Sequence, residues 1–105
     1  MTPNNLFSNL PDSTMEVFET LLETDHFKLE RIISSGQATR PGEWLDQDAD
    51  EWVILLKGRA GLLFEGEQKV CIMKPGDYIH ILAHKRHRVE WTDVKQKTVW
   101  LALHY

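Results

Sequence analysis

The sequence predicts an all-β domain, an antiparallel β-barrel preceded by a short N-terminal helix. Turn-forming residues recur about every ten residues, which is typical of short antiparallel strands rather than of alternating strands and helices. These turn signals lie at 40–42, 57–58, 65–66, 74–76 and 92–93. Two of the runs between them are apolar on both faces, so other parts of the molecule must cover the outside of the sheet.

Residues 1–26 are predicted to form an arm and a short helix packed on the barrel. The first half of this segment is rich in Asn, Pro and Ser, which suits an irregular arm. Ser13 and Thr14 can cap a helix that places Glu16 in its first turn. Apolar residues then follow at helical spacing and form one face: Met15, Phe18, Leu21 and Leu22.

Residues 27–105 are predicted to form the barrel. Alternating side chains over 27–33 indicate a first strand that ends at the turn 34–36. The run 51–56 indicates a central strand that opens on Glu51, and residues 98–105 indicate the closing strand. If Glu51 faces inward, strand alternation turns the first, third and fifth residues of its strand to the interior.

Composition and charge narrow the class of protein. A chain of 105 residues is one domain, and its net charge of −4 argues against nucleic acid as a partner. The single cysteine, Cys71, is expected to be a small buried apolar group. Neither a signal peptide nor an apolar run that could span a membrane is present, so a cytoplasmic protein without membrane contact is expected.

Two stretches resemble the motifs of the cupins. The first cupin motif ends in a Glu followed by a Gly, and Glu51 and Gly58 match this half with six residues between them. The second motif has a Pro-Gly turn and a later His, which Gly76 and His87 resemble, with Ala83 where the motif has a Gly. The resemblance spans roughly residues 36–105. It implies a small single-domain cupin, an antiparallel barrel of the jelly-roll type.

The first motif is degenerate in this chain. Its two histidines are replaced by Trp44 and Asp46 at the longer of the two usual spacings, or by Leu45 and Gln47 at the shorter one. The motif glutamate and the second-motif histidine stand at matched positions.

The resemblance implies a divalent-metal site in which Glu51 and His87 face the barrel interior. Gln47, four residues before Glu51, could supply an amide oxygen as a third donor. Such a mixed set suits Mn, Fe, Ni or Zn, and spacing does not choose between them. The alternative is structural, with Glu51 paired to Arg40 or Arg59 and His87 hydrogen-bonded in the core.

Aromatic residues indicate a small-ligand pocket. Trp44 and Trp91 flank the candidate metal residues and are predicted to line it, whereas the other two tryptophans are expected to fill the core. Tyr78 and His84 are candidates for proton transfer. Of two further strand histidines, His80 is expected to be structural and His104 to lie at a sheet face or an interface.

Two classes of function remain open. The leading hypothesis is a metal-binding protein that binds, or acts on, a small organic molecule inside the barrel. Enzymes with this barrel include dioxygenases, isomerases, lyases and decarboxylases, and the sequence does not choose among them. The alternative is a metal-free ligand-binding or sensing module, or a structural accessory subunit. A homodimer is expected, because strands with two apolar faces would otherwise expose a large apolar patch.

Overall fold

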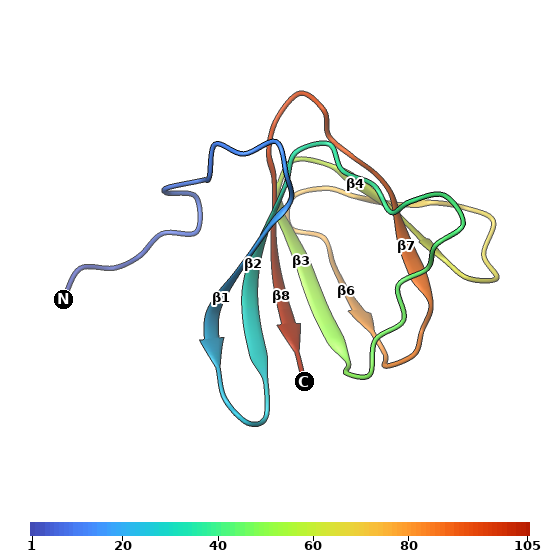
Figure 1. Ribbon diagram of the computed structural model, residues 1–105, viewed down its shortest axis with the longest axis horizontal. Coiled ribbons are helices and arrows are strands. Elements are labelled where there is room, and N and C mark those ends of the chain that lie inside the picture. Colours follow the sequence, from blue (N-terminus) through green and yellow to red (C-terminus); the bar gives the residue numbers. More distant parts are fainter.

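The computed structural model describes residues 1–105, which form eight β-strands in two facing sheets (Figure 1). The larger sheet has five antiparallel strands, in the order β1 (Val17–Glu23), β2 (Lys28–Ser34), β8 (Thr98–His104), β3 (Glu51–Lys57) and β6 (Tyr78–Ile81). The smaller sheet has the order β5 (Cys71–Met73), β4 (Ala60–Phe64) and β7 (His87–Thr92). The all-β prediction is therefore confirmed.

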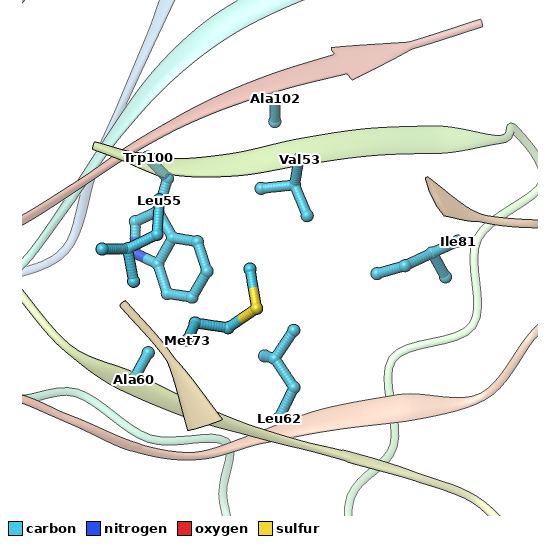
Figure 2. Close-up of a cluster of buried hydrophobic side chains, with 8 residues drawn as sticks. All are labelled: Val53, Leu55, Ala60, Leu62, Met73, Ile81, Trp100 and Ala102. Carbon is cyan, nitrogen blue, oxygen red and sulfur yellow. The ribbon is translucent and has the colours of Figure 1, made fainter. Parts of the chain in front are cut away.

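The hydrophobic core fills the space between the two sheets. Figure 2 shows Val53 and Leu55 on β3 pointing toward Leu62 and Met73 of the smaller sheet, with the Trp100 indole beside them. Successive strand residues point to opposite faces, so the core takes alternate positions of β3 and β8. The buried set is Val53, Leu55, Ala60, Leu62, Met73, Ile81, Trp100 and Ala102.

The helix predicted near residues 14–22 is absent, and the structure contains no helix. This segment instead forms β1, which pairs with β2 from Val17↔Ile33 to Glu23↔Lys28. The hairpin turn is closed by Thr24, whose N–H donates to the Phe27 carbonyl at 2.9 Å. Pairing with a neighbouring strand outweighs a helical apolar spacing that is short and carries β-branched residues.

The N-terminal arm leads away from the body of the molecule on the β1 side of the larger sheet (Figure 1). The Arg31 guanidinium on β2 donates to the carbonyls of Leu6 and Ser8, both at 2.9 Å, and to Glu19 on β1. These bonds tie the arm to the outer side of the β1–β2 hairpin. No helix of a length and apolarity that would cross a membrane is present.

A β-bulge in β7 changes which side chains face the interior. Leu62 pairs with Val89 and Gly61 with Trp91, so Glu90 is an extra residue with no partner on β4. Strict alternation would put His87, Val89 and Trp91 on one face. The bulge turns Trp91 to the opposite face, where its indole covers Gly61.

Candidate functional site

A cavity of about 390 Å³ lies between the two sheets, next to the core. Its wall combines inward-facing residues of β2, β3, β7 and β8 with the connection that runs through residues 37–47. Apolar side chains line it together with carboxylates and imidazoles: Ile32 and Trp100 are paired between β2 and β8, and Glu30 and His104 lie toward one end of these two strands. This volume lies within the range of about 300–1,000 Å³ found for small-molecule sites.

Glu51 and His87 approach one another in the wall of this cavity. Each is the first residue of its strand, β3 and β7, and both are buried. The distance between Glu51 Oε1 and His87 Nε2 is 4.0 Å. The other ring nitrogen, Nδ1, lies 2.9 Å from the Lys85 carbonyl, which places its proton there and leaves Nε2 with a free lone pair.

The Glu51 carboxylate has no hydrogen-bond partner in the protein, although its side chain is only 10% exposed. Burial raises the pKa of this carboxyl above its ordinary value, and the neighbouring Glu30 acts in the same direction. His104 and His87 oppose the rise. The ion pair with Arg40 or Arg59 that the structural alternative requires is not formed; the side chains paired with the Glu51 carboxylate within 4.0 Å are the imidazoles of His87 and His104.

A second carboxylate–imidazole pair adjoins the first. His104 on β8 lies opposite Glu51 in the sheet, with Nε2 3.8 Å from Glu51 Oε2. The same nitrogen lies 2.8 Å from Glu30 Oε1 on β2, so this imidazole is held by Glu30. Both residues line the cavity, so the sheet face on which His104 lies is the inner one. Alternation along β8 could have found it, since His104 shares its face with the buried Trp100 and Ala102.

The other end of the cavity carries a positioned carboxylate that the sequence did not single out. The hydroxyl of the fully buried Ser34 donates to Glu16 Oε2 at 2.6 Å, and Trp100 Nε1 donates to that hydroxyl oxygen at 3.1 Å. The chain of two bonds fixes one carboxylate oxygen of Glu16. The side chain itself lines the cavity. Glu16 comes from the segment predicted as a helix, so its position depends on β1.

Gln47 lines the same cavity as Glu51 and His87, and Leu45 lines it as well. Leu45 forms an isolated bridge with His87, whose carbonyl accepts its N–H at 2.7 Å. Trp44 and Asp46 are not in the cavity wall. The shorter of the two motif spacings therefore describes this chain, with Leu45 and Gln47 where the motif has histidines.

The two tryptophans predicted to line the pocket lie elsewhere. Trp91 is turned outward by the bulge in β7, and Trp44 lies beside the guanidinium groups of Arg86 and Arg88, at 5.8 and 5.9 Å from its ring centre. Trp100, expected only in the core, contributes to the cavity wall as well as to the core.

The two proton-transfer candidates also lie outside the cavity. Tyr78 is exposed on β6, with its ring centre 5.3 Å from that of Trp52 on the outer side of the sheet. His84 sits in the turn before β7 with a positive φ of 63°, and its Nδ1 lies 2.9 Å from Asp46 Oδ1. The imidazole that faces the cavity beside Glu51 and His87 is that of His104.

The comparisons with known proteins agree with this architecture. The family model described as "Cupin domain" matches residues 31–104. A protein from Ralstonia eutropha JMP134, described as a candidate mannose-6-phosphate isomerase, is 48% identical with a TM-score of 0.94, and the match covers 99% of this chain and 97% of that chain. No curated protein matches the sequence.

More distant structures are similar in fold. An RmlC-like cupin protein from Desulfovibrio desulfuricans has a TM-score of 0.74 at 18% identity, with 99% of this chain and 96% of that chain covered. An RmlC-like cupin from Methanocaldococcus jannaschii, described as having a double-stranded β-helix fold, has a TM-score of 0.71 at 16% identity, with 99% and 92% covered. Because the family model spans most of the chain and a relative of nearly equal length is this similar, the chain belongs to the cupin domain family.

Proposed function

We propose that this cupin binds a small organic molecule in the barrel cavity, beside a divalent metal ion held by Gln47, Glu51 and His87. The observation that supports this most is a pair of unused donors. The Glu51 carboxylate and His87 Nε2 lie 4.0 Å apart in a buried wall, and neither has a hydrogen-bond partner. Buried groups of this kind are costly unless a cation, a proton or water accompanies them.

The chemistry of the donors fits a metal ion. His87 Nδ1 is held by the Lys85 carbonyl at 2.9 Å, which is the arrangement that orients a histidine to coordinate through Nε2. No three His, Cys, Asp or Glu side chains are arranged so that they alone could hold a metal ion, so the amide oxygen of Gln47 would be the third protein donor. Such a set of imidazole, carboxylate and amide suits Mn, Fe, Ni or Zn.

The remaining residues of the site support binding and proton exchange. A bound divalent ion would polarise an oxygen of the ligand. His104 faces the same space and is held by Glu30 at 2.8 Å, so its imidazole is oriented to take up or release a proton on the ligand. The apolar middle of the cavity would exclude water from the ligand.

The metal assignment is tested by measuring metal content after purification with Mn, Fe, Ni and Zn. We expect His87→Ala and Glu51→Gln each to lower bound metal by at least about tenfold while the far-ultraviolet circular dichroism stays that of a β-protein. The matched controls are His26→Ala and Glu67→Gln, which remove the same groups from exposed turns. Full occupancy in both site variants, or no metal in the wild type, would refute the assignment.

A metal-free binding module is the second candidate. It is favoured by the raised pKa of Glu51, because a protonated carboxyl can be buried beside an imidazole without a metal ion. It is also favoured by the bond that already engages His104 with Glu30. Ligand binding that persists unchanged after chelation and removal of metal would support this second function over the first.

The Ralstonia relative suggests carbohydrates as one class of ligand to test. Its description as a candidate mannose-6-phosphate isomerase, at 48% identity over nearly the whole chain, makes sugars and sugar phosphates the first compounds to screen.

A further inference from the structure

We infer that the cavity selects an uncharged polyhydroxylated ligand, a sugar or polyol without phosphate, and that Glu16 is the residue that excludes the phosphorylated form. This inference rests on the proposed function only in requiring that a small organic molecule enters the cavity; it does not depend on the metal ion. Three features of the cavity carry it: the charge of its wall, the engagement of the nearby arginines, and the geometry at Glu16.

The charged side chains in the cavity wall are mostly acidic. Four carboxyls line it against a single guanidinium, which belongs to the exposed Arg40. The four are Glu16, Glu30, Glu43 and Glu51. A phosphate ester carries almost two negative charges near neutral pH and is recognised by Arg, Lys or clustered N–H donors. A wall with one guanidinium and four carboxyls therefore disfavours the binding of a phosphate ester.

The arginines of β7 and of the turn before it are already engaged. The guanidinium of Arg88 donates to the carbonyls of Glu43 and Thr39 at 3.0 and 3.2 Å, and its Nε lies 2.9 Å from Glu90. Arg86 is paired with Glu65 at 2.5 Å. Neither residue lines the cavity. Both would have to break these interactions to reach an anion there.

The carboxyls of the wall do not require a cationic ligand either. Glu30 is paired with His104 and lies 3.5 Å from Lys28 Nζ, and the Glu51 carboxylate lies 4.0 and 3.8 Å from two imidazoles. What remains is a set of oxygen acceptors around an apolar middle that includes the Trp100 side chain. Carboxylate oxygens accept hydrogen bonds from hydroxyl groups, and apolar and aromatic surfaces pack against the C–H groups of a sugar ring.

Two carboxyls are prepared for such a ligand at opposite ends of the cavity. The Glu51 side chain is nine-tenths buried and has no partner. The Glu16 carboxylate is fixed through Oε2 by Ser34, which in turn is held by Trp100 Nε1. Its other oxygen, Oε1, has no partner in the protein. Because this acceptor is already fixed in place, little further entropy is lost when it accepts a hydrogen bond from a ligand hydroxyl. Its negative charge repels a phosphate.

Isothermal titration calorimetry tests this with mannose, fructose and mannitol against mannose 6-phosphate and fructose 6-phosphate. Each titration uses the full chain loaded with Mn²⁺ and, separately, the chain treated with chelator. For at least one sugar or polyol, we expect the uncharged compound to bind about tenfold or more tightly than the phosphorylated ones. In Glu16→Lys this preference should shrink by about tenfold, and in Glu16→Gln by about threefold. Glu67→Lys has the same change of charge on an exposed turn and should leave the preference unchanged.

The outcomes separate this inference from the proposed function. Equal or tighter binding of the phosphorylated sugars by the wild type, lost in Arg40→Ala, would overturn the inference and leave the proposed binding site intact. Unchanged preference in both Glu16 variants would also overturn it. Failure of every compound to bind would refute the inference together with the proposed small-molecule site. Preference for the uncharged compound with the same affinity in the metal-loaded and the chelated chain would sustain the inference and remove the metal from the proposed function.

Discussion

Glu51 is the residue on which the candidate site depends most. It is the first residue of β3, and the sheet register places it directly opposite His104 on β8. Its carboxylate lies 4.0 Å from one imidazole and 3.8 Å from another, which is too far for a hydrogen bond to either. A buried carboxyl without such bonds is retained at a cost in stability, and this favours a role in binding.

Glu51→Gln should stabilise the metal-free protein at neutral pH. A carboxyl whose pKa is higher in the folded state than in the unfolded state binds more protons when folded, so its contribution to stability falls as pH rises through that interval. The loss begins near the ordinary value of 4.5 and is complete above the folded pKa. We therefore expect the variant to melt higher than the wild type at pH 7, by about 4–8 °C for each kcal/mol recovered.

The same comparison at pH 4 is the internal control, since both proteins then carry an uncharged group at this position. Thermal melts followed by circular dichroism across this pH range check the prediction. A variant that is less stable than the wild type at pH 7, after chelation, would contradict it.

At the scale of elements, the turn between β3 and β4, which connects the two sheets, packs against β8 so closely that it requires a glycine. Gly58 has a φ of +90°, and a Cβ atom at this position would lie 2.8 Å from the Thr98 Cα. A left-handed backbone conformation and a contact with main chain that cannot move both require glycine here. The turn thereby fixes where β3 leaves the larger sheet.

Gly58→Ala should destabilise the fold far more than Gly66→Ala. Gly66 has nearly the same φ, +89°, but a Cβ atom added there would have no other atom within 4 Å. The control therefore carries only the strain of the backbone, about 1 kcal/mol, whereas Gly58→Ala adds a clash and should cost roughly 3 kcal/mol. Urea denaturation of both variants measures the difference. Equal losses would show that the contact with Thr98 relaxes freely.

The alternation of apolar and polar residues, together with the turn signals, was enough to predict some of the strands and turns. The strands that became β2, β3 and β8 were of this kind, as were the turns that follow β2 and β3. The segment that became β1 was not, because its apolar residues fit a helix equally well and only pairing with β2 decides between the two. The bulge at Glu90 could not be predicted either, because a residue is recognised as extra only when the pairing with the neighbouring strand is known.

The site was predictable to the same extent. Glu51 and Gln47 follow from the first cupin motif and His87 from the second, and all three line one cavity. Glu16 immediately precedes β1 and Glu30 lies on β2; both are far from the motifs in sequence and reach the site only through strand pairing. Residues brought in by neighbouring strands leave no local signal of their role.

At the scale of the whole molecule, the larger sheet has an apolar outer side. Trp52 pairs with Leu103 and Ile54 with Leu101, and these four side chains, half-buried, form what we call the outer apolar face. The N-terminal arm covers the β1–β2 side of the same sheet through Arg31. The outer apolar face itself has no such cover from the arm.

We predict a homodimer with two-fold symmetry that buries the outer apolar face. Contiguous apolar side chains that remain partly exposed on a sheet face are typical of a protein–protein contact, and a two-fold pair is the simplest closed arrangement. Light scattering at micromolar concentration should give about twice the mass of 12.2 kDa. Ile54→Lys should shift this mass to that of the monomer while Glu67→Lys does not. A wild-type monomer under these conditions would refute the prediction.

Because of the bulge in β7, one residue of this strand, Glu90, could be deleted without a change in the pairing of the others. Because Glu90 has no partner on β4, its deletion would leave Val89 facing the cavity and Trp91 facing outward, with every other pair in place. Deletion of Arg88, only two positions earlier, would turn His87 away from Glu51 or shift the remainder of the strand to the wrong face. The fold should therefore tolerate loss of one residue at Glu90, whereas loss of one residue at Arg88 should disrupt it. Insertions and deletions among related barrels should accordingly be concentrated at the position that corresponds to Glu90.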